Sequence, residues 1–199
     1  MYRTSVAYLK RTDPALARVI ERVGPCRFEP RAKGTHFHAL LRSIVYQQLS
    51  GKAASTILDR VLAIYGGRYP TPAHLLDTDD EALRLAGLSR QKLAYLRDLA
   101  MKVHTGEVPL ARVRRFSDEE IITHLTHVKG IGRWTAQMFL MFRLGRPDVL
   151  PELDLGIQTA IQRAYAMPNR PTPADVLRIG APWRPHATIA SWYLWRSLE

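Results

Sequence analysis

Apolar residues recur along this chain at the three-to-four-residue spacing of amphipathic helices, and sustained alternation of apolar and polar positions is almost absent. Gly and Pro interrupt the helical spacing at Gly66 to Pro70, Gly106 to Phe116 and Pro168 to Pro173, and they predict loops there. The pattern therefore predicts an all-α fold. The predicted helices span residues 13–23, 35–49, 51–65, 72–77, 79–86, 89–105, 117–128, 133–144, 154–166, 173–179 and 184–197.

The strongest local signal is a helical hairpin between residues 117 and 145. In the first helix, Ser117 and Glu120 form a capping box, and the apolar positions fall on one face. Those positions are Ile121, Ile122, Leu125 and Val128. The second helix, RWTAQMFLMFRLG, is predicted to end at Gly145. Only the sequence KGIG at 129–132 joins the two helices, so the turn is predicted to be tight.

A tight turn with two glycines can bring bare backbone N–H groups against an anion, and the helix that follows adds a dipole favouring phosphate. We therefore assign phosphate binding to the hairpin and its next residue. This set is Lys129, Gly130, Ile131, Gly132 and Arg133. The alternative is a plain αα-hairpin that binds nothing.

Net charge favours a binding role for the hairpin. The chain has 29 Lys+Arg against 18 Asp+Glu, a formal charge of +11, which is typical of a surface that binds a polyanion. Most of the positive charge is arginine, whose planar guanidinium suits phosphate. A membrane surface is the other possible polyanion, but the sequence has no strongly basic amphipathic helix and no apolar run of about 18 residues. The predicted partner is nucleic acid, with no membrane.

Three motifs resemble one family. VKGIGRWTAQMFL and the later LPELDLGI resemble the helix-hairpin-helix, glycine/proline-rich loop, aspartate (HhH-GPD) superfamily of DNA glycosylases, within it the 3-methyladenine DNA glycosylase II type. SIVYQQLSGKAASTI at 43–57 is similar to the family's helix and turn at the DNA minor groove, and APWRPHATIASWYLW at 181–195 to its closing helix. The resemblance covers residues 35–197. The chain begins too close to the first matching helix to hold the N-terminal β-rich domain of many members.

The resemblance implies a two-lobed helical fold with a helix-hairpin-helix motif and an interlobe active-site cleft. We expect a middle lobe over residues 35–115. Residues 1–34 and 116–199 are expected to form the other lobe, which would carry the hairpin and Asp154. The expected protein is a monomer that binds double-stranded DNA containing alkylated bases. Its N-terminus lacks the long apolar core of a secretory signal, so a cytoplasmic location is predicted, nucleoid-associated if the protein is bacterial.

The cysteine content limits cofactors and redox environment. The single Cys26 excludes an intramolecular disulfide and is typical of a reducing compartment. It also excludes the four-cysteine iron–sulfur cluster of some relatives, and no cofactor is expected to be required. The resemblance implies one possible structural ion, sodium or potassium, held by the backbone carbonyls of Thr126, Val128 and Ile131.

Asp154 lies 22 residues beyond Gly132, at the position of the family aspartate. Cleavage of an N-glycosidic bond develops positive charge on the sugar, and a nearby carboxylate stabilises that charge. The carboxylate can also orient or deprotonate the attacking water. Local sequence alone predicts that Asp154 is a helix N-cap, and the two roles can coexist. Asp148 and Glu152 are nearby alternatives that better fit a solvated loop.

Trp134 indicates the reaction type. In lyase-competent relatives, a lysine two residues after the second hairpin glycine attacks the sugar and forms a Schiff base. Here that position holds Trp134, so the resemblance implies a monofunctional enzyme that uses water and leaves an abasic site. An oxidised-base glycosylase/lyase of the same fold should carry the lysine. A non-enzymatic helix-hairpin-helix DNA-binding protein would need neither Asp154 nor the matching tryptophans.

Aromatic residues indicate the substrate. A purine alkylated at a ring nitrogen is cationic, leaves readily and stacks on electron-rich rings, so the 3-methyladenine and 7-methylguanine class is predicted. The residues assigned to the base pocket are Trp134, Trp192, Met138 and Tyr46, where Met138 replaces a tyrosine of some relatives. Ordinary helix packing is the alternative for Trp134. The remaining aromatic residues near the C-terminus are predicted to be core: Trp183, Tyr193 and Trp195.

A base inside a duplex must be flipped out and the gap filled. The resemblance places this wedge on the turn QQLSG at 47–51, with Gln48 first and Leu49 second. Alternatively, Leu49 is core and the two glutamines satisfy backbone groups of the turn. His36 and His38 form an H-x-H pair without a third ligand, so they are predicted to lie on a helix surface rather than in a transition-metal site.

Overall fold

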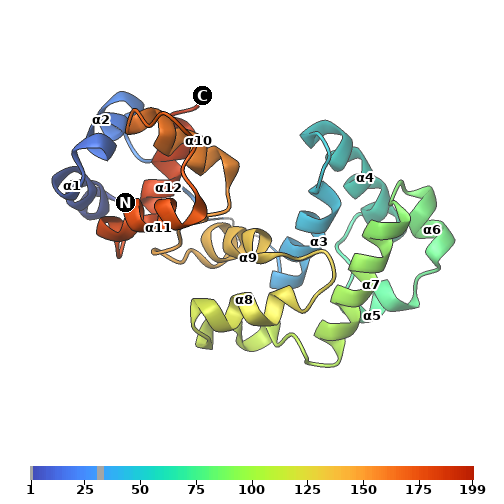
Figure 1. Ribbon diagram of the computed structural model, residues 1–199. Coiled ribbons are helices and arrows are strands. Elements are labelled where there is room, and N and C mark those ends of the chain that lie inside the picture. Colours follow the sequence, from blue (N-terminus) through green and yellow to red (C-terminus); the bar gives the residue numbers. More distant parts are fainter. Residues whose placement is uncertain (1, 31–33) are drawn as a thin grey trace. The chain divides into compact units, whose positions relative to one another are not determined.

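The computed structural model of the chain describes residues 2–30 and 34–199, and these residues fold into α-helices joined by short 3-10 and π-helical segments (Figure 1). No β-strand occurs among them, which confirms the all-α prediction. The chain divides into two compact units. Unit 1 comprises Met1–Arg31 and Leu140–Glu199, and unit 2 comprises Ala32–Phe139. None of the helices within the described ranges has the length and apolar character that crossing a membrane requires.

Unit 1 combines the two ends of the chain. Its elements are α1 (Arg3–Thr12), α2 (Pro14–Val23), the π-helical η2 (Leu140–Leu144), α10 (Leu155–Ala164), α11 (Pro173–Gly180), the 3-10 helix η3 (Ala181–Trp183) and α12 (Ala187–Arg196). The blue helices α1 and α2 lie beside α10 and α12 in Figure 1. Apolar side chains from all of them form one core, which includes Leu9, Leu16, Ile20, Ile157, Ile161, Val176, Trp183, Tyr193 and Leu194.

A buried carboxylate connects the beginning of the chain to its end. Asp13 caps α2, where its Oδ1 accepts the backbone N–H groups of Ala15 and Leu16, both at 3.0 Å. Its Oδ2 accepts the indole N–H of Trp183 at 2.7 Å and the hydroxyl of Tyr165. Asp13 is only 7% exposed, and the four hydrogen bonds that its carboxylate accepts replace those it would make with water.

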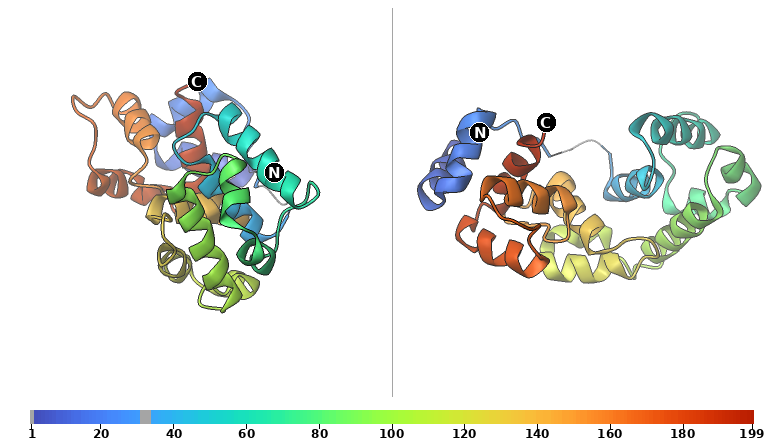
Figure 2. Two further views of the ribbon diagram at one scale, coloured as in Figure 1. Left: turned by 90° about the vertical axis from the view of Figure 1, so that its right-hand side faces the viewer. Right: turned by 45° about the horizontal axis from the view of Figure 1, so that its top comes forward.

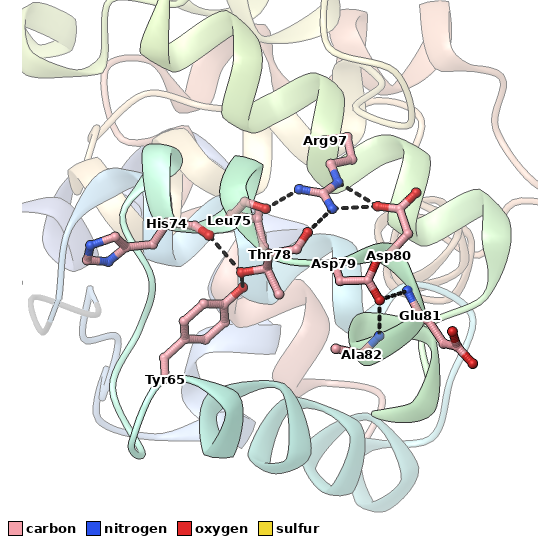
Figure 3. A network of polar contacts seen from close by, with 9 residues as sticks. All are labelled: Tyr65, His74, Leu75, Thr78, Asp79, Asp80, Glu81, Ala82 and Arg97. Carbon is pink, nitrogen blue, oxygen red and sulfur yellow. Dashed lines mark hydrogen bonds and ion pairs between the residues drawn. The ribbon is translucent and has the colours of Figure 1, made fainter.

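Unit 2 is a continuous segment. Its elements are α3 (His36–Tyr46), α4 (Gly51–Ile64), α5 (Pro72–Asp77), α6 (Asp80–Leu85), α7 (Arg90–His104), the 3-10 helix η1 (Leu110–Arg115), α8 (Asp118–Thr126) and α9 (Arg133–Phe139). The long green helix α7 packs along α3 and α5 (Figures 1 and 2). Arg97 of α7 donates to the carbonyls of Leu75 and Thr78 and, at 2.9 Å, to Asp80, which fixes the α5–α6 connection (Figure 3).

The observed helices differ from the predicted ones in several places, and the helix predicted over 35–49 ends at Tyr46. Helix α1 was not predicted, because it has no side-chain N-cap and no acid in its first turn, and its packing partners lie far along the chain. The predicted loop from Gly106 to Phe116 contains η1. The last helix begins at Ala187 rather than 184, because Pro185 supplies no backbone N–H and Asp148 accepts the N–H of Ala187 at 3.3 Å.

The division of the chain also differs from the predicted one. Residues 116–139, with the hairpin, belong to the middle unit, whereas Asp154 belongs to the unit formed by the chain ends. Contacts from α7 explain this grouping: Asp98 accepts the backbone N–H of Lys129 at 2.8 Å, and Lys102 donates to the carbonyl of His127. The expected cleft between the lobes stays a prediction.

Candidate active site and nucleic-acid interface

The hairpin has the predicted architecture. Ser117 and Glu120 form the capping box of α8, and all four apolar positions of its inner face are buried. Gly130 has φ +81°, and a Cβ there would stand 2.1 Å from the ring of Tyr95 on α7. Glycine is therefore required for both its backbone conformation and its lack of a side chain. Ile131 is buried, so the turn is anchored to the core of unit 2.

Only part of the turn offers backbone N–H groups to an anion. The N–H of Lys129 donates to Asp98, and that of Ile131 donates to the carbonyl of Val128 at 3.0 Å. The candidate N–H donors to an anion are therefore those of Gly130 and Gly132, beside the start of α9. The Lys129 residue is exposed at the surface, which suits contact with a phosphate.

Arg133 has a protein partner at the surface. Its guanidinium binds Glu119 through two parallel bonds, Nη1 to Oε2 at 2.9 Å and Nη2 to Oε1 at 2.7 Å. These bonds, opposed by partial burial, hold the pKa of Glu119 below its usual range. A DNA phosphate that takes Arg133 must therefore compete with this carboxylate.

The turn between α3 and α4 projects its predicted wedge residues outward. Gln48 has φ +56°, a conformation uncommon outside glycine, and its residue is exposed. Leu49 is 39% exposed, so the alternative that Leu49 is core was wrong. Gln47 bonds the backbone of the hairpin rather than that of its own turn: its Nε2 donates to the carbonyl of Gly130 at 2.8 Å. This bond ties the wedge turn directly to the hairpin within unit 2.

Asp154 caps α10, which confirms the N-cap prediction. Its Oδ1 accepts the backbone N–H of Ile157 at 2.8 Å and the indole N–H of Trp195 at 2.9 Å. The residue is half-buried. It therefore combines an oriented carboxylate with partial access from solvent, a combination that catalytic carboxylates need.

The expectation of a solvated loop was wrong for Glu152 but not for Asp148, which lies in a partly exposed loop before α10. Glu152 is only 8% exposed, and its backbone carbonyl accepts the side-chain amide of Gln158 at 3.0 Å. Asp148 is paired with Arg184 at 2.9 Å and bonds the first residue of α12. Both acids therefore help to shape the approach to α10 and α12.

The four predicted pocket residues are distributed over both units. Trp134, the second residue of α9, is 42% exposed, and Met138 on the same helix is half-buried. Tyr46 carries the guanidinium of Arg42 over its ring, 3.9 Å from the centroid, a cation–π contact. Trp192 on α12 is half-buried and meets Tyr193 edge-on, with ring centroids 4.9 Å apart. Their convergence on one pocket stays a prediction.

The histidine pair has structural contacts. His38 accepts the backbone N–H of Thr35 at 3.2 Å and stacks on Tyr69, while His36 meets Phe139 edge-on. Across the described residues, no three His, Cys, Asp or Glu side chains form a group that could hold a metal ion.

The whole chain was compared with known proteins. Residues 41–185 match the HhH-GPD superfamily of base excision DNA repair proteins, a stretch that contains the wedge turn, the hairpin and Asp154. The chain belongs to this superfamily. As an HhH-GPD protein it shares the all-α fold of the family's solved members.

Two solved HhH-GPD structures are similar over nearly the whole chain. One is a Schizosaccharomyces pombe 3-methyladenine DNA glycosylase in complex with abasic DNA, 35% identical with a TM-score of 0.86, covering 96% of this chain and 95% of that one. The other is a Bacillus halodurans DNA-3-methyladenine glycosidase, 38% identical with a TM-score of 0.87, covering 96% and 87%. A curated S. pombe relative, DNA-3-methyladenine glycosylase 1, is 36% identical over 193 residues, 96% of this chain and 85% of its own.

The structure adds one residue to the candidate site that sequence reasoning assigned elsewhere. Trp195 was predicted to be core, as were Trp183 and Tyr193. The latter two are fully buried, but Trp195 is half-buried and bonds Asp154. Its one-turn distance from Trp192 on the last helix was the available signal, since residues three apart lie on neighbouring parts of one face.

Proposed function

We propose that this protein is a monofunctional DNA glycosylase that flips alkylated purines out of double-stranded DNA, hydrolyses their N-glycosidic bond and leaves an abasic site. The observation that carries the proposal is Asp154, oriented by two donors on one oxygen at the position of the family aspartate. Trp134 in place of a hairpin lysine supports a reaction without a Schiff base. The names of the relatives, and abasic DNA beside one of them, support the substrate class.

The chemistry requires little beyond one carboxylate. A purine methylated at N3 or N7, such as 3-methyladenine or 7-methylguanine, carries positive charge, so the base leaves as a neutral molecule while an oxocarbenium-like charge develops on the sugar. Asp154 stabilises that charge electrostatically and orients the water that attacks the anomeric carbon. A substrate with an intrinsically weak bond needs only this modest assistance. Trp134 and Trp192, with Met138 and Tyr46, would hold the flipped base through stacking.

Residues of unit 2 would grip the DNA. The glycine amides of the hairpin bind phosphate together with Lys129 and Arg133, while Gln48 fills the gap that the base vacates. A sodium or potassium ion would lie on the carbonyls of Thr126, Val128 and Ile131; uncharged oxygens suit a hard monovalent cation, and the Val128 carbonyl keeps a second lone pair beside its bond to Ile131.

The deciding experiment incubates the protein with duplexes that each carry one lesion: 7-methylguanine, 3-methyladenine, 1-methyladenine, an etheno adduct or an oxidised purine. Free base should be released from alkylated duplexes, and strands should break only after alkaline treatment. A borohydride-trapped protein–DNA adduct would contradict the monofunctional mechanism. Binding without release of any base would instead identify a non-enzymatic DNA-binding protein, and release of only oxidised purines would change the substrate class.

The wedge has its own test. Gln48→Ala should reduce single-turnover excision from a paired lesion more than from a lesion in an unpaired loop, because only the paired lesion must replace lost stacking, worth a few kcal/mol. Leu49→Ala is the matched variant on the same turn. Equal losses on both substrates for Gln48→Ala, with a selective loss for Leu49→Ala, would move the wedge to Leu49.

A further inference from the structure

Asp154 and Trp195 form a pair across 41 positions of sequence, and both lie in unit 1. The indole N–H of Trp195 donates to Asp154 Oδ1 at 2.9 Å, on the oxygen that also accepts the N–H of Ile157 at 2.8 Å. A helix N-cap needs only the backbone donor. The indole is therefore an additional donor whose presence capping does not explain.

The ring of Trp195 is itself held in place. It stacks on Phe142 with ring centroids 5.9 Å apart and an interplanar angle of 28°. Phe142 in turn packs on Phe28, with centroids 5.5 Å apart, so three aromatic rings extend from the core of unit 1 to the carboxylate. A ring supported in this way presents its N–H from a fixed direction.

Gly156 lies so close to the Asp154–Trp195 pair that its position has no room for a side chain. A Cβ on Gly156 would stand 2.9 Å from Asp154 Oδ1, 3.1 Å from Trp195 Cδ1 and 3.3 Å from its Nε1. Alanine is favoured over glycine inside a helix, and Gly156 has an ordinary helical backbone, so local helix formation does not require it. The close approach of the Trp195 indole to the Asp154 carboxylate does require glycine at this position.

We propose that Trp195 is a positioning residue that fixes the plane of the Asp154 carboxylate, with Gly156 providing the room for the contact. The inference rests on the proposed catalytic role of Asp154. The N–H of Ile157 and the indole N–H of Trp195 come from different helices and meet on Oδ1, so together they restrict rotation of the carboxylate about its Cβ–Cγ bond. Fixing this direction before the substrate binds aligns the negative charge with the sugar without a reorganisation step.

The test compares Trp195→Phe with Trp183→Phe. Each variant keeps an aromatic ring and removes one indole N–H bonded to an aspartate of unit 1, at 2.9 Å to Asp154 or 2.7 Å to Asp13. Trp195→Phe should lower single-turnover excision of a neutral etheno lesion by about 10- to 100-fold, with unchanged affinity for abasic-site DNA. Trp183→Phe should lower the melting temperature and, while folded, excise at the parent rate.

A double-mutant cycle separates positioning from structural support. If Trp195 acts through the charge of Asp154, adding Trp195→Phe to Asp154→Asn should cost less than about 3-fold, because the charge to be aligned is already gone. Multiplying losses would overturn the inference. If Trp195→Phe folds poorly, Gly156→Ala tests the same contact. This variant should fold stably and excise as slowly as expected for Trp195→Phe. Excision at the parent rate would contradict the inference.

Two failures remain distinguishable. A parent protein that releases no base from any alkylated duplex would overturn the proposed function and this inference with it. A parent that excises normally, together with a Trp195→Phe variant that excises equally well, would overturn only the positioning role.

Discussion

Unit 1 contains two aspartates with the same local chemistry and different surroundings. Asp13 and Asp154 each begin a helix, and each accepts the indole N–H of a tryptophan from the C-terminal region. Asp13 is buried, and its two oxygens accept two backbone amides, a tyrosine hydroxyl and an indole. Asp154 is half-buried, and one of its oxygens accepts one amide and one indole.

The difference shows why a capping motif alone does not identify a catalytic residue. A carboxylate surrounded by four internal donors contributes its charge to the fold, because removing it leaves those donors unsatisfied. Asp154 caps its helix at a partly exposed position, where a carboxylate can direct its charge toward another molecule. Both residues are helix N-caps in the structure, and their burial separates them.

The largest expected effect on stability is at Asp13. Asp13→Ala removes an N-cap and leaves the buried indole of Trp183 and hydroxyl of Tyr165 without their acceptor, so the free energy of unfolding should fall by about 3–5 kcal/mol. For a chain of this length, the melting temperature should drop by roughly 10 °C. Calorimetry measures this directly. A drop of only a degree or two would mean that the two aspartates are equivalent caps, and the comparison would fail.

Asp154→Asn should show the opposite behaviour. Asparagine can still cap the helix and accept both N–H groups through its amide oxygen, so stability should change by less than about 1 kcal/mol. Loss of the charge should slow single-turnover excision of a neutral lesion by two to three decades, about 3–4 kcal/mol. Cationic lesions should lose less. Near-parent excision of a neutral lesion would move the catalytic carboxylate to Glu152 or Asp148.

A pH titration sharpens the comparison, because Asp13 accepts a hydrogen bond from a hydroxyl that titrates, that of Tyr165. Burial, followed by the hydrogen bond to Asp13, raises the pKa of Tyr165 far above its ordinary range. The folded protein therefore retains the phenol proton above pH ~10 while the unfolded chain releases it, and stability should fall as pH rises, by at most about 1.4 kcal/mol per unit. Tyr165→Phe should flatten this slope in denaturant titrations between pH 9 and 11. An unchanged slope would assign it to other tyrosines.

The smallest expected effect is at Glu119, a carboxylate that neither supports the core nor faces the sugar. Its exposed pair with Arg133 should contribute less than about 1 kcal/mol to stability. Glu119→Gln should release Arg133 to phosphate, tighten binding to undamaged duplex and steepen the salt dependence by about one phosphate contact. Glu81→Gln, with the same charge change elsewhere in unit 2, is the matched control. Equal gains from both variants would mean that only net charge matters.

Much of the fold follows from local signals in the sequence. The capping box at Ser117, the glycine turn at 129–132 and the stop at Gly145 depend on residues a few positions apart, and the structure confirms all three. The N-cap at Asp154 is equally local. Helix α1 lacks such signals and forms because Leu9 packs into a core built by residues from the far end of the chain.

The candidate site was predicted less completely, because its contacts are long-range. The bond from Gln47 to Gly130 spans 83 positions, and the bond from Trp195 to Asp154 spans 41. No periodicity connects residues so far apart. The burial of Glu152 was missed for the same reason, since a polar residue in a Pro-rich loop carries no local sign of burial. The family resemblance supplied Asp154 and Gln48, and the structure supplied the donors to Asp154 and the bond from Gln47 to the hairpin.

The composition of unit 1 from two separate stretches has a consequence for biosynthesis. As the chain leaves the ribosome, α1 and α2 emerge first with Leu9, Leu16 and Ile20 on their apolar faces, but the helices that cover them belong to residues 140–199. Unit 2 is one continuous segment, so it can complete its core while α1 and α2 still lack their packing partners. The apolar faces of α1 and α2 therefore stay uncovered until residues 140–199 have been made, so a nascent chain stalled before residue 140 exposes a surface that a chaperone can bind.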